Sequence, residues 1–485
     1  MRYEDLKTTP NPPYYLEHAP EKVLQFGEGN FLRAFADYYF DIANEKAGWN
    51  GKCVIIKPRN TPSPIWQQLN QQQGLYTVYL RGMERGVATE QKRIISSVSR
   101  CIHPYEPGGF QAMLEVAASD DLSIVVSNTT EAGIVFDPNC RLADRPADSF
   151  PGKLTQVLYH RWQHQKPGLV ILSCELIDRG GQTLQQCVLD YCVLWQLPRA
   201  FEEYIRNECL FCSTLVDRIV PGKAEDPADP LAVAAEPFGT WIIEGPAWLE
   251  NLLPLREAGL SCQVVPDVTP YKQRKVRILN GAHTGIVPGA YLAGMDIVRD
   301  AMHNDTLRGF MLQMLHREIL PTLSMDSQQL QEFTDAVLDR FRNPFIDHAL
   351  LSIALNTTSK WRTRNLPSLL DRLQQTGQLP PCLCMSLAAY IAFYSCNVQA
   401  LTDRGLQCRR PQGDVYTCQD DREVLELFWN HRLDTPEDLV HAVLSHRDFW
   451  GMDLSDIPGL EALTVSNLTK IRQDGILAAM EECYG

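Results

Sequence analysis

Three polar residues with complementary chemistry lie close together near the middle of the chain, at Lys275, Asn280 and His283. Asn280 and His283 are neighbours on any helix that contains them, and Lys275 precedes them by little more than one turn with a long side chain. An ammonium, a carboxamide and an imidazole that converge in this way could exchange a proton with a hydroxyl group and hold its oxygen. A solvated lysine and a satisfied core histidine are the ordinary alternative.

The charges that surround Lys275 favour the catalytic interpretation. Lys272, Arg274 and Arg277 all lie within three residues of it. Like charges and partial burial together lower the pKa of an ammonium group toward the range in which it exchanges protons near pH 7. Such an amine could act as a general acid/base when a hydroxyl group loses its proton and becomes a hydride donor.

A helix that begins near residue 270 must position these side chains. Thr269 is suited to cap the helix, and Pro270 to occupy its first position. The run beyond carries an apolar stripe at helical spacing, interrupted by the His283 imidazole, and its members are Val276, Leu279 and Ile286.

Length and composition bound the class of protein. At 485 residues the chain exceeds what one hydrophobic core usually serves, so two domains are expected. Its net charge of -14 disfavours nucleic acid and anionic membranes as partners, which leaves a small molecule as the expected ligand. No apolar run approaches the roughly 18 to 20 residues that cross a bilayer, and residues 1–20 are polar and proline-rich rather than a signal peptide. We expect a cytoplasmic monomer or small homo-oligomer.

The 15 cysteines are scattered mostly inside apolar segments, as reduced cysteines are in cytosolic proteins. Two closely spaced pairs, Cys209 with Cys212 and Cys382 with Cys384, lack a second pair at zinc-site spacing. We therefore expect neither disulfides nor a metal site.

The N-terminal region has the pattern of a dinucleotide-binding unit. An apolar strand over residues 22–26 runs into Gly27-Glu28-Gly29, a helix follows, and a second strand covers residues 53–56. Gly27 would permit a tight turn, and Gly29 would let backbone N–H groups approach a pyrophosphate at the helix N-terminus. Leu32 stands where the usual third glycine would be.

The end of the second strand bears on the choice of cofactor. It carries Lys57 and Arg59 instead of the acidic residue that would bond a ribose 2′-hydroxyl. Two cations can hold a 2′-phosphate, so this feature alone favours NADP.

Strand and helix patterns divide the chain in two. Beyond the first unit we predict a hairpin over 76–81 and 93–98 around 82–86, and strands over 122–126, 168–172, 240–243 and 262–265. From residue 270 helical patterns dominate, over 296–318, 327–341, 346–356, 382–395, 421–431 and 435–446. The predicted fold is α/β, with a Rossmann-like domain over residues 1–268, a mostly α-helical domain over residues 269–485 and the active site in the cleft between them.

The spacing of Lys275, Asn280 and His283 resembles the catalytic signature of the mannitol dehydrogenase family, the long-chain polyol dehydrogenases. This resemblance implies that the lysine is the general acid/base and that the other two side chains hold the reacting oxygen. The glycine-rich turn is also similar to the family form GxGxFxRA. The implied cofactor residues are Phe26, Gly27, Glu28, Gly29, Asn30, Phe31, Arg33, Thr130 and Glu131, and the implied substrate residues are Asp217 and Lys360. On grounds of charge, we add Lys57 to the expected cofactor residues and Arg364 to the expected substrate residues.

Two departures from the family pattern bear on the substrate. Leu176 stands where members acting on mannitol carry an asparagine that bonds the reacting oxygen, and Ser352 where those acting on neutral polyols carry an arginine. Lys360, Arg362 and Arg364 bring three cations together in an otherwise acidic chain. A solvated face is the ordinary interpretation of such a run, but arginine is suited to bidentate contact with a carboxylate, so we expect an anionic sugar acid.

Over residues 20–480 the chain is similar to those family members that interconvert D-altronate and D-tagaturonate with NAD. This resemblance contradicts the NADP preference drawn from the second strand, and we follow the resemblance while leaving NADP open. The alternatives are fructuronate reduction, oxidation of a neutral polyol such as mannitol, and a catalytically silent dinucleotide sensor.

Overall fold

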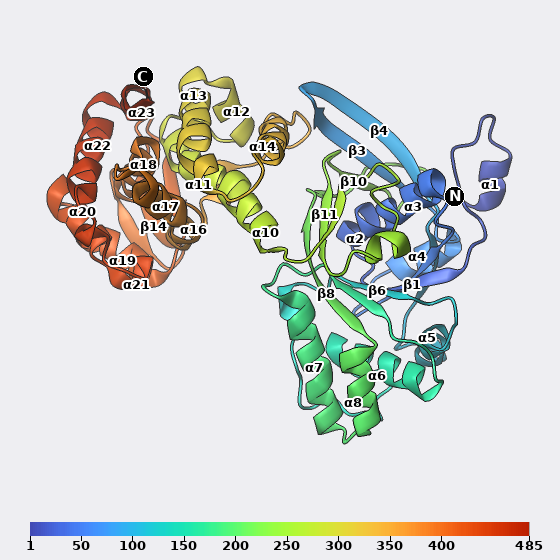
Figure 1. Cartoon of the computed structure of the whole chain (residues 1–485). Coiled ribbons are helices and arrows are strands. Elements are labelled where there is room, and N and C mark those ends of the chain that lie inside the picture. Colours follow the sequence, from blue (N-terminus) through green and yellow to red (C-terminus); the bar gives the residue numbers. More distant parts are fainter. Residues whose placement is uncertain (485) are drawn as a thin grey trace. The chain divides into compact units, whose positions relative to one another are not determined.

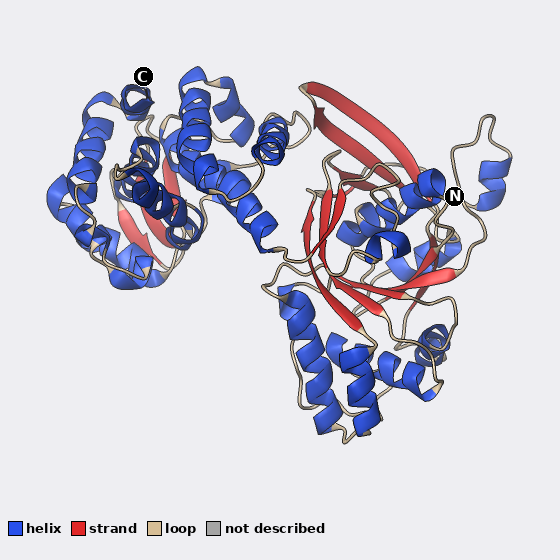
Figure 2. Cartoon of the chain, viewed as in Figure 1, coloured by secondary structure: helices blue, strands red, loops and turns tan. Residues whose placement is uncertain are grey.

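The computed structural model describes residues 1–484, apart from the side chain of Glu131. These residues form two compact units (Figure 1). The first comprises Met1–Gly82 and Thr89–Val268, and the second Met83–Ala88 and Thr269–Gly485. Figure 2 shows most of the strands in the first unit and a mainly helical second unit.

A mostly parallel sheet organises the first unit. Among the described residues it has eight strands, in the order β12 (Cys262–Val265), β11 (Thr240–Glu244), β8 (Leu210–Asp217), β7 (Val170–Ser173), β6 (Ile124–Ser127), β1 (Glu21–Phe26), β2 (Lys52–Ile56) and β5 (Val98–Ile102). Neighbouring strands are parallel except for β8 and β11. Because the chain leaves β1 toward β2 and later returns to its other side as β6, the carboxyl ends of β1 and β6 form a topological switch point, where such sheets bind ligands.

Both faces of this sheet are buried, which is why its strands read as continuous apolar runs. Val23 and Ile55 pack into one core together with Trp241 and with Phe35, which lies between α2 and α3. Leu24 lies in the core on the opposite face. The helices of this unit are α1 (Tyr3–Lys7), α2 (Asn30–Ala34), α3 (Ala36–Ala47), α4 (Ile65–Gln71), α5 (Gly109–Ala117), α6 (Phe150–Gln163), α7 (Gly180–Leu194), α8 (Arg199–Asn207) and α9 (Leu249–Leu252).

A smaller sheet in the first unit contains the predicted hairpin. Its strand order is β4 (Val87–Ile95), β3 (Tyr76–Glu84), β10 (Val233–Ala235) and β9 (Gly222–Lys223). The hairpin turns at Arg85 and Gly86, both with positive φ, so its strands are longer than the sequence indicated. Val98, expected to end its second strand, instead begins β5 of the main sheet.

Helices dominate the second unit, as predicted, but it also contains a small antiparallel sheet that the sequence did not reveal. That sheet consists of β13 (Ala400–Thr402), β14 (Gly405–Arg409) and β15 (Val415–Cys418). The helices are α10 (Thr269–Lys275), α11 (Gly281–Leu292), α12 (Val298–His303), α13 (Asp305–Gln313), α14 (Ser327–Phe341), α15 (Leu350–Ile353), α16 (Thr357–Arg364), α17 (Leu366–Thr376), α18 (Pro381–Ser395), α19 (Arg422–Asn430), α20 (Pro436–Leu444), α21 (Arg447–Trp450), α22 (Leu460–Asp474) and α23 (Ile476–Tyr484).

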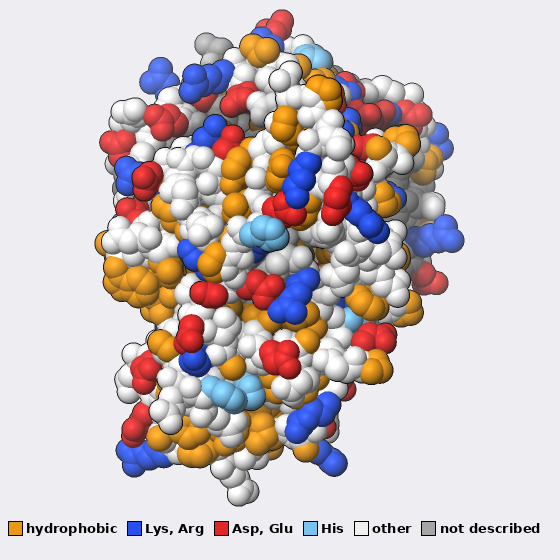
Figure 3. Space-filling view, turned by 90° about the vertical axis from the view of Figure 1, so that its right-hand side faces the viewer, with side chains coloured by type: hydrophobic (Ala, Val, Ile, Leu, Met, Phe, Trp, Pro, Cys, Tyr) orange, Lys and Arg blue, Asp and Glu red, His pale blue; other side chains and the backbone are white. Residues whose placement is uncertain are grey.

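The described helices include none that is both long and apolar enough to cross a bilayer. On the face drawn in Figure 3, Lys and Arg side chains are scattered among acidic and apolar ones rather than gathered into one area. This distribution gives that face no basic stripe of the kind that tracks a phosphate backbone.

A buried carboxyl group supports the turn that follows β1. Asp37 on α3 is fully buried, and burial raises its pKa to about 7. The hydroxyl oxygen of Tyr76 lies 2.8 Å from Asp37 Oδ2 and 2.9 Å from the Arg33 carbonyl oxygen. A phenol carries one hydrogen, so both contacts become hydrogen bonds when a protonated Asp37 donates to Tyr76 and Tyr76 donates to Arg33. Gln25 contacts the same carboxyl group and also donates to the Gly27 carbonyl.

We expect this carboxyl group to make folding stability depend on pH. In the unfolded chain an aspartate ionises near pH 4, about three units below the folded value, so the contribution of Asp37 to stability falls as the pH rises from about 4 to about 7. Asp37→Asn removes the ionisation, so its thermal midpoint relative to the natural chain should rise by about 5 °C or more between pH 5 and pH 8. The exposed Asp403→Asn is the control, and an equal pH dependence for all three proteins would contradict the assignment.

Candidate active site

The three candidate catalytic residues lie on a helix that changes its winding between them. Lys275 ends α10, a π-helical turn covers Val276–Asn280, and His283 lies in the first turn of α11. The sequence predicted one uninterrupted α-helix, in which residues five apart differ by about 140° around the axis. A π turn instead bonds residues five apart, here from the Gly281 N–H to the Val276 carbonyl, so it brings Lys275 and Asn280 to the same side.

An ion pair and a close helix contact hold this turn. Arg277 Nη1 donates to Asp371 Oδ2 at 2.5 Å and to Thr322 Oγ1 at 3.1 Å. A Cβ on Gly281 would meet the Asn365 side chain at 3.3 Å, and one on Gly285 would meet the methyl group of Met314 at 2.6 Å. A larger residue at either position would therefore require Asn365 or Met314 to shift, so glycine permits this close approach.

The cations expected to crowd Lys275 are used in different ways. Arg277 is paired with Asp371, as described above, and the Arg274 guanidinium lies 4.4 Å from the centre of the Phe333 ring. Burial, followed by the charge of Lys275, lowers the pKa of Lys272, so these two ammonium groups do repel each other. Lys275 itself is half-buried.

His283 is a neutral imidazole with one unused nitrogen. Its ring stacks on Phe341 with 4.1 Å between centroids and meets the His348 ring edge-on at 5.4 Å. Burial, followed by the charges of His348, Arg340, Arg364 and Lys360, holds its pKa well below the usual range. Its Nε2 is buried and has no hydrogen-bond partner in the part of the chain that the structure describes. An orphaned nitrogen of this kind is suited to a bound hydroxyl or carbonyl oxygen.

The three cations of α16 divide between two faces of the helix. Lys360 and Arg364 are four residues apart and share the face toward His283, where Arg364 donates to Thr284 Oγ1 at 3.1 Å and Lys360 to the Ile353 carbonyl at 2.8 Å. Burial lowers the pKa of both groups. Within residues 1–484, neither has a carboxylate at ion-pair distance. Arg362 is exposed and donates to the Asp448 carbonyl instead.

The first unit has a pocket of about 520 Å³ at the carboxyl ends of β1 and β6. The glycine-rich turn forms one wall of it, and the loop after β6 forms another. Gly27 has a φ of +133°, which only glycine adopts readily, whereas Gly29 has an ordinary φ of −67° and open space where a Cβ would project. The backbone of Gly29 therefore forms a cradle that any larger residue would fill, and a dinucleotide pyrophosphate fits this arrangement.

The pocket separates the expected cofactor residues into two groups. Its lining includes the following members of the expected set: Gly27, Glu28, Gly29, Asn30, Phe31 and Thr130. It also includes Arg59, one of the two cations considered for a 2′-phosphate, and residues that the sequence did not single out for the cofactor, namely Asn128, Asp148 and Ser149. Asp148 and Ser149 immediately precede α6 and are remote in sequence from the glycine-rich turn. No local sequence pattern connects them with the cofactor. The Glu131 side chain lies outside the described residues.

The other expected cofactor residues that the structure describes, Phe26, Arg33 and Lys57, are buried and do not line the pocket. Phe26 is fully buried in the core below the sheet. Arg33 is buried and donates to the Glu28 carbonyl at 3.2 Å, to the Leu231 carbonyl at 2.6 Å and to Asn30 Oδ1 at 2.7 Å. The Lys57 ammonium is also buried, and it donates to the carbonyls of Arg59 and Thr61, each at 2.6 Å. The Arg33 and Lys57 side chains thus stabilise loops of the first unit instead of lining the pocket.

Glu175 joins the ends of β6 and β7. This buried carboxylate accepts from the hydroxyls of Ser127 at 3.0 Å and Ser173 at 2.7 Å, and from the backbone N–H and hydroxyl of Thr129 at 2.8 and 3.0 Å. The next residue, Leu176, is 59% exposed. Asp217, an expected substrate residue, is buried at the end of β8.

Comparison with known proteins adds independent evidence. The mannitol dehydrogenase Rossmann domain matches residues 21–257 and the mannitol dehydrogenase C-terminal domain matches residues 267–472. Altronate oxidoreductase of Bacillus subtilis (strain 168) is 42% identical over 480 residues, which cover 96% of this chain and 95% of the relative. Altronate oxidoreductase of Klebsiella pneumoniae (strain 342) is 43% identical over 483 residues, with 95% and 96% covered.

Two solved structures share the fold over 99% of both chains. A D-sorbitol dehydrogenase in substrate-free form superposes with a TM-score of 0.81 at 22% identity. Mannitol 2-dehydrogenase of Pseudomonas fluorescens, solved as a ternary complex with NAD and D-mannitol, superposes with a TM-score of 0.66 at 21% identity.

The open space at Gly29 gives a direct test of the dinucleotide pocket. Gly29→Ala should leave the thermal midpoint unchanged, because its φ is ordinary and no atom lies within 4 Å of the added Cβ. It should raise the Kd for NADH by about tenfold or more, since the methyl group occupies the pyrophosphate cradle. Fluorescence titration measures this affinity, and Gly27→Ala serves as a contrast in which the strained φ lowers the thermal midpoint as well. Unchanged NADH affinity for Gly29→Ala would place the pyrophosphate elsewhere.

The family models together span most of the chain, and the relatives match it almost from end to end. The residues at the switch point of the sheet fit a nicotinamide dinucleotide, as expected for a Rossmann domain. This chain therefore belongs to the mannitol dehydrogenase family, as an oxidoreductase of the polyol or aldonate dehydrogenase type.

Proposed function

We propose that this chain interconverts D-altronate and D-tagaturonate with NAD, as a tagaturonate reductase of hexuronate catabolism. The names of relatives at 42% and 43% identity support this substrate pair. The observation that carries the proposal is the pair Lys360 and Arg364, two partly buried cations beside His283. Neither forms an ion pair with a described carboxylate, although the charge of Asp420 raises the pKa of Lys360 against the larger effect of burial. Desolvated charges of this kind require an anion, which a sugar acid supplies and a neutral polyol does not.

Lys275 would carry the proton in both directions of the reaction. During oxidation its amine removes the hydroxyl proton of the substrate, and during reduction its ammonium returns a proton to the carbonyl oxygen. Asn280 and the unused Nε2 of the neutral His283 would hold that oxygen by hydrogen bonds. When bound, the dinucleotide accepts or supplies the hydride.

The far end of the substrate would be held by charge. The carboxylate of a hexulosonate lies at the opposite end of the molecule from its carbonyl, so the group that binds it need not touch Lys275. Lys360 and Arg364 are assigned this role, and Asp217 is assigned to accept from a substrate hydroxyl. Binding energy gained at the carboxylate would then orient the carbonyl for reaction.

NAD is the proposed cofactor in spite of the basic end of β2. The NADP argument required two cations, and the Lys57 ammonium is already bound to two backbone carbonyls. Arg59 is thus the one residue of that pair that lines the pocket. Parallel titrations with NADH and NADPH test this choice.

An assay of NADH oxidation with a panel of substrates tests the proposal against its alternatives. Tagaturonate should be the preferred substrate. Preference for fructuronate would indicate a fructuronate reductase (D-mannonate oxidoreductase), and preference for fructose a neutral-polyol dehydrogenase such as mannitol 2-dehydrogenase. NADH binding without turnover of any substrate would indicate a dinucleotide-sensing protein.

Replacement of the proposed acid/base separates proton transfer from cofactor binding. Lys275→Ala should lower kcat by about a thousandfold or more in both directions, because no other group replaces the positioned amine. The Kd for NADH should stay within about twofold, because the glycine-rich turn of the first unit binds the cofactor. Steady-state kinetics and NADH titration provide the two readouts, and parallel losses of rate and affinity would refute this division of roles.

The two faces of α16 provide a matched pair of variants for the carboxylate site. Arg364→Ala should lower kcat/KM for tagaturonate by about a hundredfold or more, the usual cost when a desolvated charge loses its partner. The same variant should change kcat/KM for fructose by less than about fivefold. Arg362→Ala, on the exposed face, should leave both values unchanged, and Lys360→Ala should resemble Arg364→Ala. Equal losses on both substrates would mean that these cations are structural.

A further inference from the structure

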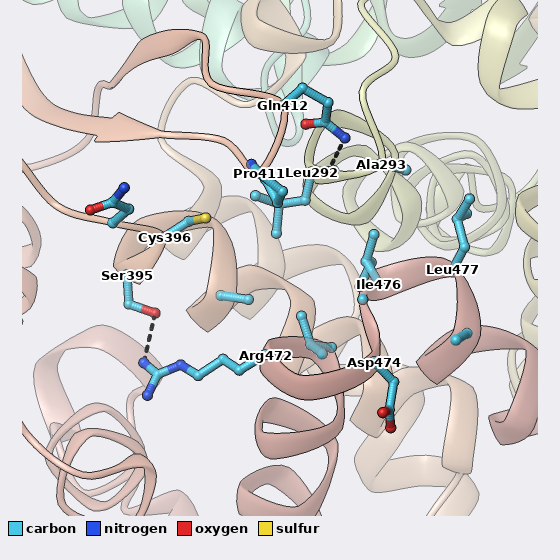
Figure 4. A pocket seen from close by; sticks show the side chains of 15 residues that line it. Leu292, Ala293, Ser395, Cys396, Pro411, Gln412, Arg472, Asp474, Ile476 and Leu477 are labelled. Carbon is cyan, nitrogen blue, oxygen red and sulfur yellow. Dashed lines mark hydrogen bonds between the residues drawn. The ribbon is translucent and has the colours of Figure 1, made fainter.

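A second pocket lies in the helical unit, where three helices end and one begins (Figure 4). It has a volume of about 490 Å³, within the range of small-molecule sites. Leu292 at the end of α11, Ser395 at the end of α18 and Asp474 at the end of α22 contribute to its wall, together with Ile476 at the start of α23. None of the proposed catalytic or carboxylate-binding residues lines it.

The pocket has a cation on one side and apolar side chains on the other, and the polar side chains of Gln412 and Asp474 also line it. Figure 4 shows the Arg472 guanidinium and Ser395 together on one side, while Ile476 and Leu477 lie on the opposite side. The apolar side chain of Leu292 lies between these two ends. This separation suits an elongated amphipathic molecule better than a sugar, which carries hydroxyl groups along its whole length.

The polar end contains a cation that has no counter-ion. Arg472 Nη2 donates to Ser395 Oγ at 3.4 Å, and no acidic group of residues 1–484 lies within ion-pair distance of its guanidinium. In Figure 4 the Asp474 carboxylate is directed away from that guanidinium. Arg472 is an exposed residue at the rim of the pocket, and partial burial of its guanidinium lowers its pKa. An anion placed beside it could be held at two points by the planar guanidinium.

We propose that this pocket binds a monocarboxylic acid with an unbranched apolar chain, of the medium-chain fatty acid class. The carboxylate binds Arg472 and Ser395, and the hydrocarbon chain extends toward Ile476 and Leu477. The site is independent of the proposed substrate, because Leu292 is separated from His283 by nine residues of α11, about 14 Å along the helix. Such a ligand would not compete with a sugar acid.

Octanoate is a suitable probe. Octan-1-ol, which has the chain without the charge, and acetate, which has the carboxylate without the chain, are its controls. Isothermal titration calorimetry with the full-length protein should show saturable binding of octanoate, at least about tenfold tighter than that of either control, because only octanoate offers both chain and charge. Arg472→Gln should weaken octanoate binding by about tenfold or more, whereas the exposed Arg404→Gln should not.

A second variant tests the cavity without touching the charge. Ala478 is exposed and lines the pocket, so Ala478→Trp should fold normally and block octanoate while leaving Arg472 in place. The thermal midpoint of each variant without ligand verifies its fold. Equal binding of octanoate and octan-1-ol, or unchanged octanoate binding by either variant, would overturn the proposal.

Discussion

The winding of one short segment determines the geometry of the candidate active site. Lys275 and Asn280 come to one side of their helix because the turn between them is π-helical. A π turn is intrinsically less favourable than an α turn, so other contacts must hold it in place. The Arg277–Asp371 ion pair and the close approach permitted by Gly281 supply such contacts, so α17 and its neighbours support the geometry of the candidate site.

Hydrogen-bond satisfaction distinguishes structural cations from functional ones in this chain. Arg33 and Lys57 are buried, but backbone carbonyls occupy their donors, so each stabilises a loop of the first unit. Lys360 and Arg364 each donate one hydrogen bond within the described residues and retain further donors, and burial lowers the pKa of both groups. The same cations help to keep His283 neutral, so anion binding and oxygen binding arise from one electrostatic arrangement.

Sequence reasoning identified the glycine-rich turn and several strands of the main sheet, because glycine spacing and apolar runs are local signals. It also named both classes of fold in the right order along the chain. It could not foresee the π turn, since nothing in residues 276–280 specifies winding, nor the engaged state of Lys57, which depends on the path of the loop to Thr61. The division of α16 into two faces was accessible from the spacing of Lys360, Arg362 and Arg364 alone, because residues four apart share a face and residues two apart do not.

The replacement at Leu176 can be understood from the groups that surround it. An exposed leucine offers no donor to a reacting oxygen, and the adjacent Glu175 is saturated by four hydrogen bonds from the ends of β6 and β7. Neither residue offers the amide that the family resemblance led us to expect at this position. In contrast, His283 Nε2 is buried without a hydrogen-bond partner among the described residues. In the proposed mechanism, His283 and the half-buried Asn280 therefore bind the reacting oxygen from the same helical segment that carries the proton donor, Lys275.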